Sequence, residues 1–299
     1  MENKKITLLA CDIESDNINL SNSSLYTKLL EKLKTGAPAD TRRMKLNASL
    51  PDEDMLSNYG HTDEYVYGTM FRIAPSKESP SIPDDLFKND KINLNDIASK
   101  DNKTLLICKE YYYFAINKSV LITSMPKSRV KSFQTYINWL LGGTEFRLNP
   151  KIKSDLKIKL NEIKRIEFQD VNEDLKSGKE KNMSIIELAK DKLCNLAVDI
   201  PSLDNLINEK IISAKLLLKI ADKNKKISQE DLNRKLGSLI RPINEDENIV
   251  LTLKGGRRIR GNNIIDTKEV YIEIINENNM ISEQQLWQEM LIFMREFNK

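Results

Sequence analysis

A run of strand-forming segments with only short turns between them constrains the fold of this chain more than any other feature. The strand candidates are residues 103–109, 111–116 and 119–123. Asn117-Lys118 provides a hairpin turn between the last two. A strand and a helix precede this meander and a helix follows it, at 4–13, 21–35 and 127–141. This order predicts an antiparallel sheet covered by helices.

The second half of the chain has a different pattern. Helical spacing of apolar residues predicts helices at 184–197, 203–222 and 228–240. Alternating strands at 248–254 and 268–275 and a closing helix from Ser282 follow. A chain of 299 residues is long enough for two compact parts. We therefore predict an α+β protein, with an N-terminal α+β domain at 1–150 and a C-terminal helical domain with a β-hairpin at 151–299. The polar segment 37–62 is expected to be mostly loop.

Composition narrows the class of protein. Hydrophobic residues make up 40% of the chain and charged residues 30%, which is typical of soluble globular proteins. The first apolar stretch is short and has the pattern of a strand, not of a signal peptide, so we expect a cytoplasmic protein without direct membrane insertion. The three cysteines lie far apart in apolar surroundings and are expected to be buried thiols. Because close Cys and His pairs are missing, the sequence predicts no metal site and no cofactor.

Catalytic motifs are scarce. His61 is the only histidine, whereas Ser-His-Asp and Cys-His hydrolases need a base of near-neutral pKa. No phosphate-binding loop of the Walker or dinucleotide type is present. We predict a protein without hydrolytic activity. The alternative is a metal-dependent nuclease that uses carboxylates such as Asp155 and Glu162.

The most distinctive local feature is a basic segment between two strand candidates. Four cationic side chains and three glycines, with no acid, lie between Lys254 and Asn263; the cations are Lys254, Arg257, Arg258 and Arg260. Glycines let a backbone approach a phosphate, and arginines bind phosphate oxygens with two hydrogen bonds. This pattern predicts a hairpin tip that binds nucleic acid, DNA above all. The alternative is a surface loop whose arginines pair with Asp266 or Glu269.

Two further basic sets are candidates for the same partner. Lys215 and Lys219 lie four residues apart on the predicted helix 203–222. Lys127 and Arg129 lie in the first turn of the helix at 127–141, where a bound phosphate offsets the repulsion from the helix dipole. The net charge of the chain is only +3, so a nucleic-acid site requires local concentration of charge. For each set, the alternative is an ordinary solvated surface.

The closing helix carries more apolar residues than one buried face needs. Leu286, Met290, Phe293 and Phe297 form one stripe, and Trp287, Leu291 and Met294 form a second beside it. Wide apolar surfaces mark interfaces, and two-fold dimers are the commonest closed assembly. We therefore expect a homodimer.

The middle third of the chain is similar in its order of parts to a family of phage-defence proteins. Residues 113–122, a helix that ends in Trp139-Leu140-Leu141, the segment 146–150 and the strand 161–169 follow one another as in RexA-like phage-exclusion proteins. RexA-like proteins and the KwaB component of the Kiwa system are dimeric DNA-binding proteins. The resemblance implies a DNA-binding role in antiviral defence, with a membrane or defence-system protein as a possible partner. A pure protein-interaction subunit of such a complex is a further alternative.

Overall fold

The structure is a computed structural model, and it divides the chain into two compact units. Unit 1 comprises Met1–Pro150 and Thr267–Lys299, and unit 2 comprises Lys151–Asp266. The structure describes residues 3–15, 24–34, 36–47, 50–75, 84–93, 106–143, 146–156, 162–171, 213–218, 228–240, 249–260, 263–275 and 281–297. The expectation of a single C-terminal domain at 151–299 is therefore wrong for Thr267–Lys299, which belongs to unit 1.

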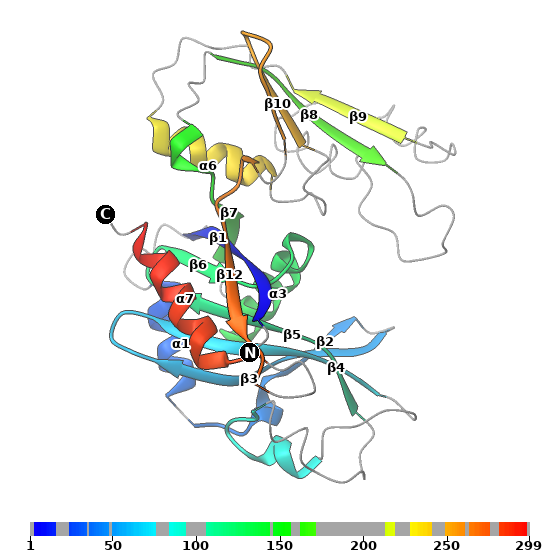
Figure 1. The fold of residues 1–299 in the computed structure, drawn as a ribbon. Helices are drawn as coiled ribbons and strands as arrows, with labels where there is room; N and C mark the ends of the chain where they lie inside the picture. The colour runs from blue at the N-terminus through cyan, green and yellow to red at the C-terminus, as the bar shows by residue number, and fades with distance from the viewer. Residues whose placement is uncertain are drawn as a thin grey trace. The chain divides into compact units, whose positions relative to one another are not determined.

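Unit 1 is built on an eight-stranded antiparallel sheet (Figure 1). Its strands are β1 (Asn3–Ser15), β2 (Arg43–Asn47), β3 (Leu50–His61), β4 (Val66–Pro75), β5 (Leu106–Ile116), β6 (Val120–Thr123), β7 (Phe146–Pro150) and β12 (Thr267–Glu273). They are ordered β12-β1-β6-β5-β4-β3-β2, and β7 also pairs with β1. The expected antiparallel sheet with helices is confirmed. The expected loop at 37–62 is wrong, because β3 pairs with β2 on one side and with β4 on the other. This pairing outweighs the weak strand propensity of its polar sequence.

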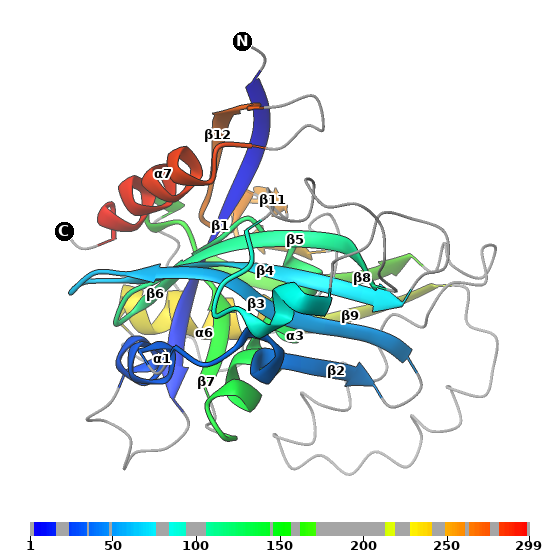
Figure 2. The ribbon, with the colours of Figure 1, turned by 90° about the horizontal axis from the view of Figure 1, so that it is seen from below.

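Helices cover both faces of this sheet (Figure 2). They are α1 (Leu25–Leu33), α3 (Lys127–Leu140) and α7 (Glu283–Arg295), and two short 3₁₀ turns, η2 (Ala39–Arg42) and η3 (Asp84–Lys88), accompany them. Serine side chains cap two of the helices. The Oγ atoms of Ser24 and Ser282 accept hydrogen bonds from the backbone N–H groups of Thr27 and Gln285 at 3.2 and 3.3 Å.

Alternation along β5 separates two apolar cores. Tyr113 and Ala115 belong to the core that contains α7, together with residues of β1, β6 and β12. Phe114 points to the other face, where its ring centroid lies 5.0 Å from that of Phe133 on α3. Successive side chains of a strand alternate between faces, so one strand serves both cores. The aromatic run of β5 is therefore core packing on both faces.

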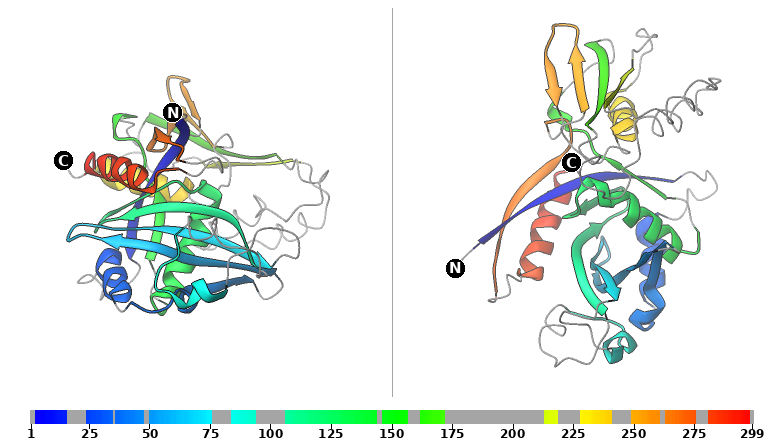
Figure 3. Two further views of the ribbon diagram at one scale, coloured as in Figure 1. Left: turned by 60° about the horizontal axis from the view of Figure 1, so that its bottom comes forward. Right: turned by 90° about the vertical axis from the view of Figure 1, so that its right-hand side faces the viewer.

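The curl of the sheet explains the wide apolar face of α7 (Figure 3, right). Met294 is buried, and the ring centroid of Trp287 lies 4.5 Å from that of Tyr67. Leu291 and Phe297 pack against the same core. The stripe that predicted a dimer interface is thus largely internal, because a curled sheet contacts more of a helix than a flat one does. The homodimer stays a prediction, and this stripe of α7 no longer supports it.

Unit 2 contains a four-stranded antiparallel sheet in the order β11-β10-β8-β9. Its elements are η4 (Ser154–Leu156), β8 (Ile163–Val171), β9 (Ser213–Leu218), α6 (Gln229–Ile240), β10 (Ile249–Leu253) and β11 (Arg258–Arg260). The predicted helix 203–222 is wrong at 213–218, where β9 pairs with β8. Its remaining residues and the predicted helix 184–197 lie outside the described residues.

The predicted hairpin also has a different partner strand. β10 turns into β11, whereas β12, which was expected to complete the hairpin, pairs with β1 in unit 1. The hairpin is the orange pair of strands in the right-hand view of Figure 3. Two residues of the basic segment, Arg258 and Arg260, are therefore part of a strand and not of the loop.

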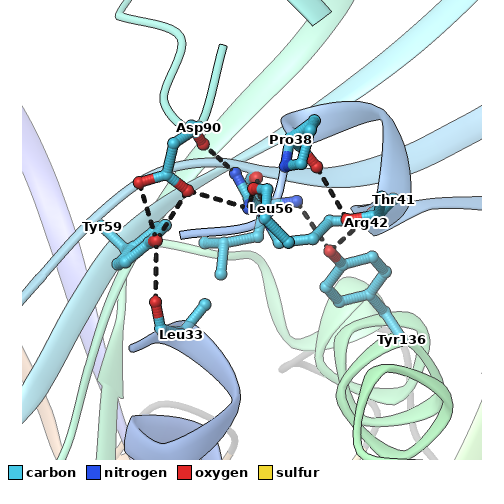
Figure 4. Close-up of polar contacts among 9 residues, drawn as sticks. Leu33, Pro38, Thr41, Arg42, Leu56, Tyr59, Asp90 and Tyr136 are labelled. Carbon is cyan, nitrogen blue, oxygen red and sulfur yellow. Dashed lines mark hydrogen bonds and ion pairs between the residues drawn. The ribbon is translucent and has the colours of Figure 1, made fainter. Parts of the chain in front are cut away.

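A buried arginine joins three segments of unit 1 (Figure 4). The Arg42 side chain is 4% exposed and donates hydrogen bonds to the carbonyl oxygens of Ala37 at 2.7 Å and Leu56 at 3.1 Å. Its guanidinium also bonds both the backbone oxygen and the carboxylate of Asp90. Tyr59 donates its hydroxyl hydrogen to the same carboxylate at 2.8 Å. The network holds the segment after η3 against η2 and β3.

The first prediction is that Arg42→Ala lowers the free energy of unfolding by about 3 kcal/mol or more, because it leaves buried acceptors without their donor. Chemical denaturation at neutral pH measures this loss. Arg43→Ala is the matched control, since Arg43 pairs with Asp40 and Glu53 in a less buried position. It should cost about 1 kcal/mol or less. Equal losses in the two variants would contradict the role given to Arg42.

A half-buried glutamate, Glu283, lies where α7 begins on the sheet. Glu283 accepts hydrogen bonds from the Thr69 hydroxyl at 3.3 Å and the Asn58 amide at 3.4 Å. Burial raises the pKa of Glu283 above its usual value, and the hydrogen bonds oppose this shift. The folded state therefore keeps the proton to higher pH than the unfolded chain does. Stability is lost as pH rises through the folded-state pKa.

The second prediction is that Glu283→Gln flattens the dependence of stability on pH. The neutral amide avoids burying a charge, so the variant should gain stability relative to the natural chain as pH rises from acidic to neutral. Thermal unfolding across this range measures the difference. Glu289→Gln, on the same helix but without the hydrogen bonds to Thr69 and Asn58, should leave the curve unchanged. A difference between Glu283→Gln and the natural chain that stays constant with pH would refute the assignment.

Candidate nucleic-acid interface

The sheet of unit 2 has one polar and one apolar face. Its register places Arg165, Thr252 and Arg258 in one row across β8, β10 and β11. Directly opposed residues share a face, and their neighbours along each strand point to the other side. The adjacent positions Leu251 and Ile259 are buried, whereas Arg258 and Arg260 are exposed. The arginines therefore share one face, on which Val250 and Thr252 are buried between them, whereas Leu251 and Ile259 pack on the other face.

A buried carboxylate organises the polar face. The side chain of Glu167 on β8 is 1% exposed. One of its oxygens lies 2.5 Å from Nε of Arg165, and the other lies 3.3 Å from a terminal nitrogen of Arg258. Both arginines remain partly exposed, at 39% and 46%. Glu167 thus holds two guanidinium groups from different strands at the surface.

The hairpin tip extends this face with further positive charge. Lys254, Gly255, Gly256 and Arg257 are all exposed. The turn is closed by hydrogen bonds from Gly256 N to Leu253 O at 3.0 Å and from Leu253 N to Arg257 O at 2.9 Å. Gly256 has a φ of +81°, a conformation that residues with a Cβ rarely adopt. Within the described residues, no ion pair involves Lys254, Arg257 or Arg260.

The structure brings together four of the eight predicted contact residues. Lys254, Arg257, Arg258 and Arg260 lie on one hairpin. The acid that pairs with Arg258 is Glu167 and not the expected Asp266 or Glu269; Glu269 pairs with Lys5 at 2.8 Å. The sequence pattern did not single out Arg165 and Glu167, although both lie in the strand predicted at 161–169.

The structure describes only one residue of the second basic set. Lys215 lies on β9, opposite Gln169 in the register, and not on a helix. In the register, Lys215 therefore occupies the same alternating position as Arg165 and Glu167 on β8. Lys219 lies outside the described residues. The i, i+4 spacing of the lysines therefore no longer supports a helical stripe.

The third basic set belongs to unit 1 and is engaged within it. Arg129 donates a hydrogen bond to Glu110 at 3.0 Å, and Glu110 also lies 3.9 Å from Arg72. Burial lowers the pKa of Lys127 to about 8, with the neighbouring Cys11 acting in the opposite direction. The charge of Arg129, whose side chain is 37% exposed, is paired with Glu110, and Lys127 is half-buried at the start of α3.

Charge is divided unequally between the two units. Unit 2 contains 24 Lys and Arg residues against 19 Asp and Glu residues, a net charge of +5. Unit 1 contains 23 against 25, a net charge of −2. The net charge of the whole chain, +3, is therefore the sum of a basic unit 2 and a slightly acidic unit 1.

The described part of the chain gives less support to a metal site, a catalytic site or a membrane-spanning helix. No group of three or more His, Cys, Asp or Glu side chains there is placed to hold a metal ion. Asp155 belongs to η4, and the exposed Glu162 directly precedes β8 and accepts a backbone hydrogen bond from Lys254 at 2.8 Å. His61 is exposed at the end of β3. Among the helices in the described segments, none has the length and apolar character needed to cross a bilayer.

Comparison with protein-family models and with curated proteins finds no match to this chain. The similarity to RexA-like proteins therefore stays a prediction.

The third prediction separates the arginines by their contact with Glu167. Arg258→Ala should destabilise the protein by about 1–3 kcal/mol, because the buried carboxylate loses one of its two cations. Arg257→Ala and Arg260→Ala should change stability by about 0.5 kcal/mol or less. In a Glu167→Gln background, Arg258→Ala should cost much less than it does alone, and a double-mutant cycle by chemical denaturation measures this coupling. Purely additive effects would contradict the ion pair.

Proposed function

We propose that the protein binds nucleic acid through the phosphate backbone, and that the polar face of the unit 2 sheet and its hairpin tip form the binding surface. One observation carries the proposal: exposed arginines and a lysine from a glycine-containing hairpin continue a row of arginines that Glu167 holds in place. Guanidinium groups fixed before binding lose less entropy when they meet a phosphate. Glycines at the tip let the main chain approach the backbone of the ligand.

The residue types of unit 2 favour a double-stranded ligand. Lys151–Asp266 contains a single aromatic residue, Phe168. Phe168 pairs with Ile249 in the register, and it occupies the alternating position opposite to that of Arg165 and Glu167 on β8. Proteins that bind single strands stack bases on aromatic side chains, and this unit has almost none. Two-stranded ribbons fit into a groove of duplex DNA, and contacts to phosphates require no base reading.

The proposed biological role is DNA binding in antiviral defence, and it rests on the RexA-like order of parts in the middle of the chain. That role includes a homodimer, a cytoplasmic location and a defence-system protein as partner. The lack of a base-reading motif supports little sequence preference. The proposal does not require hydrolysis of the bound DNA.

The fourth prediction concerns affinity and its dependence on salt. The protein should bind short duplex DNA more tightly than a single strand of the same length, in a fluorescence anisotropy titration. The logarithm of the affinity should fall with the logarithm of salt concentration by about 0.9 for each phosphate contacted. Changing Lys254, Arg257 and Arg260 together to alanine should flatten that slope by about 2–3 units. Arg258 is kept, because its loss also perturbs Glu167.

The matched control removes the same number of exposed cations from unit 1. Lys4, Lys45 and Lys131 are exposed, and changing them to alanine lowers the net charge equally. This variant should retain most of the affinity and the original slope. Equal loss in both triple variants would mean that net charge alone attracts DNA, and absence of binding at low salt would end the proposal. Plasmid cleavage in the presence of Mg²⁺ or Mn²⁺ would favour the nuclease alternative.

A further inference from the structure

A hollow of about 310 Å³ lies in unit 1 at one end of the sheet. It is lined by the turn between β3 and β4, the turn between β5 and β6, and the last turns of α7. The two sheet turns are neighbours because β4 begins opposite the end of β5, where Val66 pairs with Ile116. The volume falls at the lower end of the range for small-molecule sites.

The floor of this hollow is apolar and well packed. Met294 is buried, and Leu291 and Tyr65 are half-buried and pack against the core under α7. A ligand with an apolar group can cover this floor and remove its exposed part from water.

The turns that form the walls are fixed by their own hydrogen bonds. The Thr62 hydroxyl oxygen accepts from the backbone N–H groups of Glu64 and Tyr65 at 3.2 and 3.3 Å. The side-chain oxygen of Asn117 accepts from Ser119 N at 2.9 Å and from Val120 N at 2.7 Å. The walls are therefore preorganised, which lowers the entropic cost of binding.

The rim carries both signs of charge without internal pairing. Asp63 and Glu64 lie on one turn, whereas Lys118 lies on the neighbouring turn and Arg295 lies in the last turn of α7. In the described part of the chain, no ion pair joins any of these four side chains to another residue. Because these opposite charges share one hollow and do not pair with each other, a ligand that carries both a cationic and an anionic group can pair with both sets.

We propose that this hollow binds a small amphipathic zwitterion, namely an amino acid or dipeptide with an apolar side chain. Its ammonium group binds at Asp63 and Glu64, and its carboxylate binds at Lys118 and Arg295. Its apolar side chain lies on Leu291 and Tyr65. The site belongs to unit 1 and does not depend on the proposed nucleic-acid surface of unit 2.

The test uses the full chain with leucine and leucyl-leucine as probes in calorimetric titration. Saturable binding is expected. N-acetylation or C-terminal amidation of either probe should weaken it by about two- to fivefold, because each removes one exposed charge pair. Glycine, which lacks the apolar group, should bind more weakly than leucine. No saturable binding of either probe, or equal affinity for the capped forms, would overturn the proposal.

Paired variants test the position of the site. Glu64→Gln and Arg295→Gln should each weaken binding about two- to fivefold, and the double variant should weaken it by about the product. Glu289→Gln and Lys131→Gln are the controls, since both residues lie in unit 1 outside the hollow. Glu64→Gln should spare the affinity for N-acetylated probes, which have no ammonium group to lose. Variants that match the controls in every titration would place the binding elsewhere and refute this site.

Discussion

The pairing of β1 with three other strands is the constraint on which the rest of the architecture depends. Asn3–Leu9 pairs with β12, Leu9–Asp12 with β6, and Cys11–Ser15 with β7. The strand before unit 2 and the strand after it are therefore both held by β1. Unit 2 is an insertion into unit 1, and its two connecting segments pair with each other through Ile152 and Ile265. An insertion whose ends are already close adds little loop-closure entropy to the folding of its host.

The two proposed binding sites lie on different units. β12 returns to the edge of the unit 1 sheet and α7 packs on it, so the core contains residues from both ends of the chain. Unit 2 bears the basic surface, and its net charge of +5 contrasts with −2 for unit 1. Under the proposed function, substitutions on the hairpin are expected to change nucleic-acid affinity without disturbing the core of the host unit.

Some elements were predictable from the sequence because their signals are local. The meander at β5 and β6, the caps of α1 and α7, and the glycine-rich turn at Gly256 depend on neighbouring residues. Three features required knowledge of distant pairing. Ser213–Leu218 lies within a segment whose residues have helical spacing, but it forms a strand because β8 offers a partner. The second stripe of α7 is internal because the sheet curls around the helix, and Glu167 became part of the site only when three strands were aligned.

Glu167 also shows why a surface suited to phosphates contains a buried acid. Arg165 and Arg258 lie in one row on β8 and β11, on either side of Thr252, and their mutual repulsion would drive their flexible side chains apart. A carboxylate between them removes this repulsion and fixes both guanidinium groups, while the two arginines and the acid together still carry a charge of +1. The desolvation of Glu167 is offset by its two cations, in contrast to an isolated buried charge. Both arginine side chains stay partly exposed, so the face combines a row held by Glu167 with the exposed cations of the hairpin tip. Such a surface favours a ligand with regularly spaced negative charges, and a duplex backbone is one.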